Sequence, residues 1–475
     1  MSAARDAQAP EAIIVGAGPA GMAAASILAE AGAAVLLLDE NPAPGGQIWR
    51  GVDAATAVHR SRLGADYAAG RRATRRLAAS GARHLPGTTV WQLSPLVTGA
   101  EIGWTDGQRA RLATVPVVIL ATGAQERPFP IAGWTLPGVM SVGGAQTLLK
   151  SSSLAAEGAV FAGTGPLLYL VVAQYLAAGV PVAAVLETTA PGALGRAAWS
   201  APAALRRPAL LAKGLQWIAA IRRAGVRHIR GVRGLRVLGE TAATGIAWRM
   251  GDGRWREIAT EHVFLHQGVV PSVNLSMAAG LAHRWCPQQL AWVPRTDAWG
   301  QTGSPGLFVA GDGAGIAGWQ AAEARGAVAA QAALVRLGRL SPVQARLRAA
   351  PDRRRIAAEG RLRPFLDAWF RPAEAFRVPE DPETVVCRCE EITAGALRAA
   401  IAQGLAGPNQ LKSFTRAGMG PCQARSCALT LHETIAHQTG RPAGQIEPLR
   451  FRPPVKPLSI SELADMTFDD GAGHG

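Results

Sequence analysis

The cysteines of this chain are few and unevenly placed. Of five in 475 residues, four fall between positions 387 and 427, as a Cys-x-Cys pair followed after 32 residues by a Cys-x-x-x-x-Cys pair. Four thiolates in two close pairs suit either a zinc ion or a 2Fe–2S cluster. Zinc sites usually separate paired ligands by about two to four residues, so the short first pair favours the cluster and leaves zinc as the alternative. The candidate ligands are Cys387, Cys389, Cys422 and Cys427.

A glycine-rich turn near the start of the chain has the spacing of a dinucleotide-binding unit. The apolar run 12–15 leads into this turn and an Ala-rich helix, and a second apolar run ends at Asp39, 23 residues after Gly16. The turn contains Gly16, Gly18 and Gly21, which would form the tight bend, admit a pyrophosphate and allow close helix–strand packing, in that order. The helix N-terminus supplies N–H donors to the phosphates, and the acid can bind a ribose hydroxyl.

A second unit with the same layout begins near residue 159. Its turn contains Gly163 and Gly165, but Leu168 stands where the third glycine would be. A bulky side chain there crowds the helix against the strand. Two interpretations stay open: a site for a second nucleotide, NAD or ATP, in which Glu187 favours a free 2′-hydroxyl, or a Rossmann unit that has lost its ligand.

Two later apolar strands, 117–120 and 307–310, complete the first unit. Small and polar residues follow them: Ala121, Thr122 and Gly123 after the first, Gly311 and Asp312 after the second. A strand that ends in Gly-Asp before a helix directs the helix N-terminus at a phosphate, although Asp312 could instead be an N-cap. The pattern predicts an α/β fold in which one nucleotide-binding domain, residues 141–289, is inserted in another, residues 1–140 and 290–340.

Composition excludes several classes of protein. The chain has 49 basic and 34 acidic residues, a net charge of +15, but the arginines are scattered and do not alternate with aromatic residues. We therefore expect no nucleic-acid partner. No apolar stretch reaches the length of about 18 residues that a transmembrane helix needs, and no apolar signal segment opens the chain. With so few cysteines, these features predict a cytoplasmic protein.

The first unit and its later strands resemble the flavoprotein family that includes glutathione and thioredoxin reductases. In that family the first turn holds FAD, Ala-Thr-Gly marks the crossover to the inserted domain, and the late Gly-Asp contacts the flavin's ribityl–phosphate region. Those reductases carry a cysteine pair beside the flavin, whereas no cysteine here precedes Cys286. Disulfide reduction is therefore excluded, and we interpret Cys286 as a small buried residue.

Residues 383–440 resemble the small domain of bacterioferritin-associated ferredoxin, in which four cysteines bind one 2Fe–2S cluster. By this resemblance the four clustered cysteines are the cluster's ligands, and residues 383–440 form a small helical domain. The Arg-rich residues 341–382 before it predict a helical linker. The proline-containing residues 441–475 after it predict an extended C-terminal tail.

Nearly the whole chain resembles one narrower family, the large flavoprotein subunits of bacterial opine oxidases, hydrogen cyanide synthases and (hydroxy)proline dehydrogenases. The resemblance rests on the runs 38–50 (LDENPAPGGQIWR), 121–128 (ATGAQERP), 163–169 (GTGPLLY) and 311–318, together with the four cysteines. It implies that FAD is held by residues of the first unit: Gly16, Gly18, Gly21, Asp39, Glu40, Gly46, Gln47, Arg50, Ala121, Thr122, Gly123, Gly311 and Asp312.

The same resemblance implies a division of labour. A glycine-oxidase-like beta subunit would oxidise the C–N bond of an amino or imino acid with its own FAD, an FMN would lie at a subunit interface, and a small ferredoxin-like subunit would accompany them. This chain would pass electrons outward, and no catalytic residue is assigned to it because no acid–base or nucleophile set stands near the motifs. Two alternatives remain: a self-contained NADH-dependent FAD/2Fe–2S reductase, and a scaffold with a structurally bound nucleotide.

Overall fold

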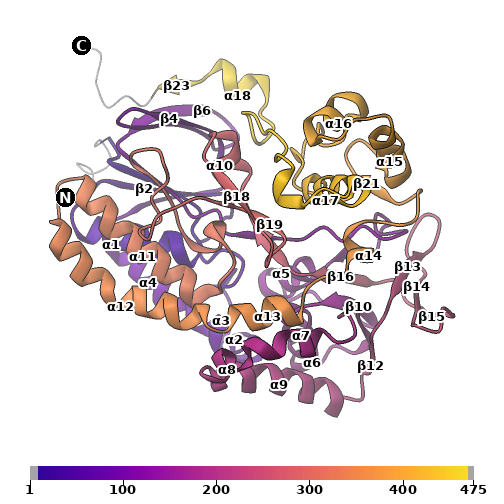
Figure 1. The fold of residues 1–475 in the computed structure, drawn as a ribbon. Coiled ribbons are helices and arrows are strands. Elements are labelled where there is room, and N and C mark those ends of the chain that lie inside the picture. The colour runs from indigo at the N-terminus through magenta and orange to yellow at the C-terminus, as the bar shows by residue number, and fades with distance from the viewer. Residues whose placement is uncertain (1–8, 469–475) are drawn as a thin grey trace.

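The computed structural model of the chain describes residues 9–468. Two five-stranded sheets, each with all its strands parallel, form the centre of the molecule (Figure 1). The first sheet runs, in spatial order, through β20 (Leu307–Val309), β7 (Val117–Leu120), β1 (Ala12–Val15), β2 (Val35–Asp39) and β3 (Arg83–Pro86). The strands of the second sheet lie in sequence between β7 and β20. The α/β class with Rossmann-like units is therefore confirmed.

The first sheet is covered on both faces. Ile14 and Leu37 point into a core shared with helices, whereas Ile13 and Leu36 point into a core shared with an antiparallel meander, as the period-two alternation of strands requires. The helices are α1 (Pro19–Glu30), α4 (Gly70–Ser80) and α11 (Trp319–Arg336), with α12 (Pro342–Gly360) packed outside α11 and the short α2 (Ala57–Leu63) and α3 (Ala65–Ala68) nearby. The meander is β4 (Thr89–Leu96), β5 (Gly99–Thr105) and β6 (Ala110–Val115), with α10 (Asn274–Ala278) against β4.

The second sheet has its own layers. Its spatial order is β12 (Arg227–Arg230), β11 (Val182–Glu187), β10 (Ala159–Thr164), β16 (Val263–Gln267) and β9 (Val139–Ser141). Helices α5 (Val142–Ser152), α6 (Pro166–Ala177) and α9 (Pro208–Arg223) pack on one side, and the antiparallel strands β13 (Gly234–Leu238), β14 (Gly245–Arg249) and β15 (Trp255–Ala259) share a core with the other. Three shorter helices, α7 (Ala193–Ala197), η1 (Ala198–Ser200) and α8 (Ala201–Leu205), precede α9.

A two-stranded ribbon links the units. It pairs β8 (Ala124–Glu126) with β17 (Val269–Pro271) in antiparallel register, just after β7 and β16 respectively. A hairpin of β18 (His283–Cys286) and β19 (Ala291–Pro294) follows before the chain returns to the first sheet. Cys286 is half-buried in this hairpin rather than buried as predicted, because a two-stranded hairpin covers only one side of its residues.

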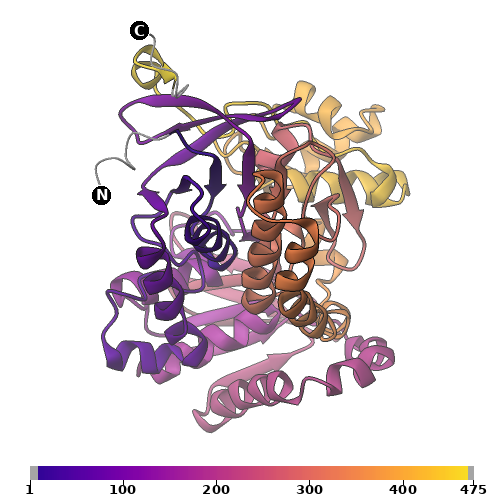
Figure 2. The same ribbon diagram turned by 90° about the vertical axis from the view of Figure 1, so that its left-hand side faces the viewer.

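The C-terminal cysteine unit has a separate small core. Helices α13 (Arg363–Trp369) and α14 (Glu374–Arg377) lead to β21 (Val385–Cys387), β22 (Ile392–Thr393), α15 (Ala394–Ala402), α16 (Pro408–Thr415), α17 (Ala428–Thr439) and η3 (Ala443–Gln445). The tail then crosses to the meander and ends in α18 (Ile460–Ala464) and β23 (Thr467–Phe468), which pairs with β6 (Figures 1 and 2). Residues 469–475, predicted as the end of the tail, lie outside the described residues.

No helix between residues 9 and 468 is long and apolar enough to span a bilayer.

Candidate cofactor sites

The first glycine turn forms a cradle in which a side chain at several glycine positions would collide with the backbone. A Cβ at Gly21 would lie 1.8 Å from the carbonyl oxygen of Gly16, and a Cβ at Gly46 would lie 2.8 Å from the Cα of Gly18. Gly16 itself has a φ of +102°, which favours glycine. Within residues 9–468, no side chain caps the N-terminus of α1, where Gly18 is the N-cap. The N–H groups of this helix end can therefore receive a phosphate.

The two acids predicted beside this turn have different surroundings. Asp39 is buried at the end of β2, and its carboxylate accepts hydrogen bonds from the backbone N–H of Ala17 at 2.5 Å and of Asn41 at 2.7 Å. These bonds hold Asp39 against the glycine turn. Glu40 instead forms an ion pair of 2.7 Å with Lys456 of the C-terminal tail, so this carboxylate is engaged by a residue 416 positions away.

The loop after β2 is anchored by a lysine that the sequence did not single out. Nζ of Lys150, on α5, donates to the backbone oxygen of Gln47 and to Oε1 of Gln146, each at 2.9 Å. Burial and the nearby charge of Arg50 lower the pKa of Lys150 to about 7. The side chain of Gln47 is exposed, whereas Nε of Arg50 is buried without a partner among the described residues. Only three-dimensional packing brings Lys150 to this loop.

The segments after β7 and β20 close around the same turn. Ala121 approaches it directly, since a Cβ at Gly16 would lie 2.5 Å from the oxygen of Ala121. A Cβ at Gly311 would lie 2.9 Å from the Cβ of Ala20. Gly123 has a φ of +67°. The hydroxyl of Thr122 donates to the backbone oxygen of Ser272 at 2.9 Å.

Asp312 lies in the short 3-10 turn η2 (Gly311–Ala314), between β20 and α11. Its Oδ1 accepts the backbone N–H groups of Ala317 at 2.9 Å and Gly318 at 3.2 Å. Gly318 is the N-cap of α11. Asp312 is therefore not the N-cap residue itself, but its carboxylate binds backbone N–H groups just before that helix, including that of Gly318. Its second carboxylate oxygen has no hydrogen-bond partner among the described residues.

The second glycine turn is built differently. Gly163 and Gly165 have φ values of +141° and +119°, but Leu168 is fully buried in the core, and the His266 imidazole lies beside the turn, with Nε2 3.2 Å from where a Cβ of Gly165 would be. Nδ1 of His266 is 2.7 Å from Glu126, which also accepts the N–H of Gly143 at the start of α5.

The acid of the second unit is already paired. Glu187 lies 3.0 Å from Nε2 of His228 and 3.5 Å from Nε of Arg230. Burial tends to raise the pKa of Glu187, but hydrogen bonds from His228, Tyr169 and Thr189 outweigh it and lower that pKa overall. The sequence did not reveal these partners, because His228 and Arg230 lie on β12 and Tyr169 lies on α6.

The four clustered cysteines form two neighbouring pairs. The thiols of Cys387 and Cys427 hydrogen-bond each other, as do those of Cys389 and Cys422. The bond from Cys427 lowers the pKa of Cys387 to about 6, against the effect of burial and with help from the backbone N–H groups of Gly418, Glu390 and Cys389. Among residues 9–468, no three His, Cys, Asp or Glu side chains are already gathered around one ion position.

Close packing shapes the loops that carry these thiols. A Cβ at Gly420 would lie 2.1 Å from the Cβ of Cys389. Gln423 and Ala424 have φ values of +49° and +58°, so the segment between Cys422 and Cys427 turns tightly. Two thiol pairs supported by backbone N–H donors fit a cluster of two irons, which needs two thiolates on each iron.

The cysteine loop is bonded to the ribbon between the two units. Nε2 of Gln125 donates to the backbone oxygen of Arg425 at 3.1 Å, and Nδ2 of Asn274 donates to that of Gln423 at 2.8 Å. Gln125 stands two residues after Gly123 in the chain. The loop that carries two of the thiols therefore contacts the segment that borders the first glycine turn.

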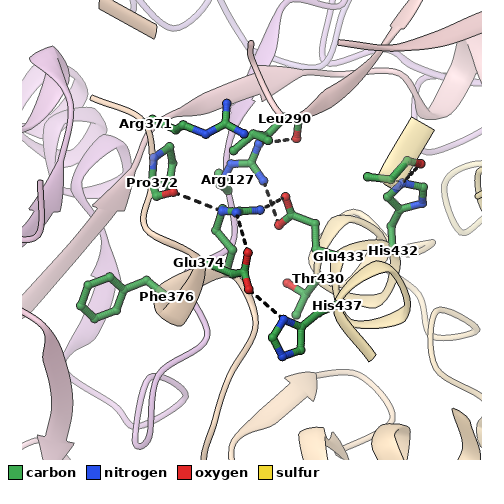
Figure 3. A network of polar contacts seen from close by, with 12 residues as sticks. Arg127, Leu290, Arg371, Pro372, Glu374, Phe376, Thr430, His432, Glu433 and His437 are labelled. Carbon is green, nitrogen blue, oxygen red and sulfur yellow. Dashed lines mark hydrogen bonds and ion pairs between the residues drawn. The ribbon is translucent and has the colours of Figure 1, made fainter. Parts of the chain in front are cut away.

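A buried ionic cluster fixes α17 to the rest of the molecule (Figure 3). Glu433 of α17 receives Arg127 at 3.5 Å and also pairs with Arg377. Arg127 donates as well to the backbone oxygens of Gln289 and Leu290. Because the side chains of Arg127 and Glu433 are each 4% exposed, the pair lies in the interior. It restrains the helix that begins directly after Cys427.

Two parts of the chain match known protein domains. Residues 14–79 match the NAD(P)-binding Rossmann-like domain, and residues 382–466, with all four clustered cysteines, match the sarcosine oxidase A3 domain. The chain is 43% identical to the opine oxidase A subunit of Agrobacterium tumefaciens (strain Ach5), over 96% of this chain and 91% of that protein. The chain belongs to the family of the opine oxidase A subunits. This membership confirms the prediction of an oxidoreductase subunit.

The chain is also similar to a more distant relative in sequence and to two solved structures in fold. The HcnB subunit of the hydrogen cyanide synthase of Pseudomonas aeruginosa is 34% identical over 96% of this chain and 98% of its own length. The crystal structure of L-proline dehydrogenase from P. horikoshii has the same fold, with a TM-score of 0.67 at 18% identity over 96% of this chain and 79% of that chain. Thioredoxin reductase of T. acidophilum shares the fold over 68% of this chain and 97% of its own, with a TM-score of 0.51 at 19% identity.

Proposed function

We propose that this chain is the electron-transferring FAD and 2Fe–2S subunit of a multi-subunit amino- or imino-acid dehydrogenase of the opine type. The observation that carries the proposal is the contact of the cysteine loop with Asn274 and with Gln125, which follows the Ala121–Gly123 segment of the first unit by two residues. Electron transfer needs two redox centres close together, and this contact supports that arrangement. Relatives named as subunits support a complex with other chains.

The residues of the first turn would hold FAD. The backbone N–H groups at the start of α1 would bind the pyrophosphate, Asp39 the ribose and Asp312 the ribityl–phosphate region. The thiolates of Cys387, Cys389, Cys422 and Cys427 would hold the cluster. When bound, a flavin accepts two electrons and releases them singly, and a 2Fe–2S cluster carries one. The protein's part is to fix the two centres and to donate hydrogen bonds to the sulfurs, which tunes the potential.

Several parts of the proposal concern other molecules. A glycine-oxidase-like beta subunit would oxidise the substrate, a small ferredoxin-like subunit would accompany it, and an FMN would lie at a subunit interface. The second glycine turn, in residues 141–289, would bind at most an inert nucleotide such as ATP or NAD, since Leu168 is buried at the turn and Glu187 is paired.

The test is an anaerobic visible spectrum of the purified chain with iron and zinc analysis, before and after NADH. We expect flavin and iron–sulfur bands that stay oxidised with NADH and bleach with dithionite. Bleaching by NADH within a second would make the chain a self-contained reductase instead. A preparation without flavin bands would identify a scaffold, and zinc in place of iron would overturn the cluster.

A further inference from the structure

The helices α7 to α9 lie at the lower edge of the molecule in Figures 1 and 2, beside α13 and α6. They carry several large apolar side chains that are exposed. Trp199 is 76% exposed, Leu205 67%, Leu215 64% and Leu194 55%. Single exposed apolar residues are ordinary, but a group of them on one short segment marks a surface that binds something.

In this segment the small residues are buried and the large apolar residues are exposed. Along α7, η1 and α8 the buried residues are Ala193, Ala197, Ser200 and Ala204, all small, at the three- and four-residue spacing of one helix face. The large apolar residues of the segment lie off that stripe, toward solvent. A surface helix of a soluble protein normally has the opposite pattern, with its large apolar residues inward.

The basic residues of the same helices have no acidic neighbour in sequence. From Ala193 to Arg223, the span of α7 to α9, the chain has six basic residues and no acidic one. Two of them pair with carboxylates of other segments, Arg207 with Glu359 and Lys213 with Asp66. The exposed arginines of α7 to α9 have no ion-pair partner within residues 9–468: Arg196, Arg206, Arg222 and Arg223.

We propose that α7 to α9 form a docking face for an anionic phospholipid surface. Trp199 and Leu205 would enter the headgroup layer, and the unpaired arginines would contact lipid phosphates, which is how interfacial helices bind. A protein surface usually carries both signs of charge. Six basic residues without an acid in the same helices, four of them unpaired among the described residues, are better matched by the uniform negative charge of a bilayer than by a protein partner. The inference uses neither flavin nor cluster, so it can fail without the proposed function failing.

The test is flotation of the full-length protein with vesicles of phosphatidylglycerol and phosphatidylcholine in equal parts. We expect binding to these vesicles, little binding to pure phosphatidylcholine, and release as salt rises. The double variant Trp199→Ala/Leu205→Ala should bind at least about tenfold more weakly. Its matched control is Phe414→Ala, since Phe414 is 75% exposed on α16, away from this face.

A second pair of variants separates specific docking from net charge. Arg206→Glu/Arg222→Glu should lose binding, whereas Arg346→Glu/Arg348→Glu, with the same change in charge on α12, should retain it. All of these residues are exposed, so thermal unfolding should show intact folding. Equal binding to neutral vesicles, or equal loss in both charge variants, would overturn the proposal. Absence of vesicle binding would also overturn it and would leave the face to a protein partner.

Discussion

The two glycine turns of this chain occupy equivalent places in two similar sheets, yet they offer a ligand different surroundings. In the first, Gly21 packs against Gly16 where any side chain would collide, and Ala121 closes the neighbouring strand. In the second, a buried Leu168 takes the third position, and the His266 imidazole stands beside the turn. The fold is thus retained in both units, but the close helix–strand packing at the third glycine is present only in the first.

The acids at the ends of β2 and β11, Asp39 and Glu187, also differ in their surroundings. Asp39 is oriented toward its turn by backbone N–H groups, so it can accept a further hydrogen bond from a ribose. Glu187 is oriented away from that role by His228 and Arg230. An acid at the end of the second strand of a Rossmann unit can therefore have a purely structural role. Its presence in a sequence does not distinguish this role from ribose binding.

The largest effect is expected when the leucine of the second turn is placed in the first. Gly21→Leu places a Cβ 1.8 Å from the Gly16 oxygen, so the helix must move away from the strand and the phosphate cradle is lost. We expect a protein without bound flavin, measured as the ratio of flavin to protein absorbance. Retention of a full complement of flavin would contradict the assignment of this turn. Gly360→Ala, at a position with open space and without a positive φ, controls for loss of a glycine.

Removal of one thiol tests whether the cysteine loop is a separate centre beside the first turn. Cys422→Ser should abolish the iron–sulfur absorption and leave the flavin bands, because the loop contacts the ribbon and not the cradle. The visible spectrum and the iron content measure this. Cys286→Ser is the matched control and should change neither band. Cluster absorption that survives in Cys422→Ser would remove this residue from the ligand set.

Shortening Leu168 tests whether the second turn is a core and not a binding site. Because the side chain is fully buried, Leu168→Ala should lower the free energy of unfolding by about 2–5 kcal/mol, measured by urea denaturation. It should not make the bound flavin reducible by NADH, since Glu187 stays paired. Rapid reduction by NADH in this variant would mean that Leu168 alone closes a working nucleotide site.

The smallest effect concerns the acid of the second unit. Glu187→Gln should cost about 1–2 kcal/mol at neutral pH, because hydrogen bonds to a buried charge are lost. The pKa of Glu187 is lowered from its ordinary 4.5 in the folded state. Its stabilisation is therefore present above that value and disappears as pH falls through the lowered pKa. Urea titrations of both proteins at neutral and acid pH should converge in acid. The exposed pair of Glu40 is the contrast: Glu40→Gln should cost less than about 1 kcal/mol.

Local patterns were sufficient to predict much of the fold. Strands β1 and β7 lie at the predicted residues, and the glycine turns and the two acids at the strand ends follow from spacing and end signals that lie within a few residues. The positions of Gly16, Gly18, Gly46 and Gly311 around one turn agree with their prediction as one group, although the ligand they would hold stays a prediction.

What the sequence could not predict depends on contacts between distant segments. Lys150 reaches the loop after β2 across 103 positions, and Lys456 reaches Glu40 across 416. Neither lysine belongs to a local motif, because each meets its partner only in the folded protein. The pairing of Arg127 with Glu433 is of the same kind, because it joins the residue directly after β8 to a helix of the cysteine unit more than 300 positions away.

The tail leaves the cysteine unit at η3, crosses the meander and pairs with β6 as β23. The cysteine unit is consequently tethered at both ends, by the linker helices before it and by the tail after it, and is clamped between them by Glu433. Such a unit has little freedom to swing. An electron that crosses it would not have to wait for a domain motion, so the rate of transfer between the two centres should be independent of solvent viscosity.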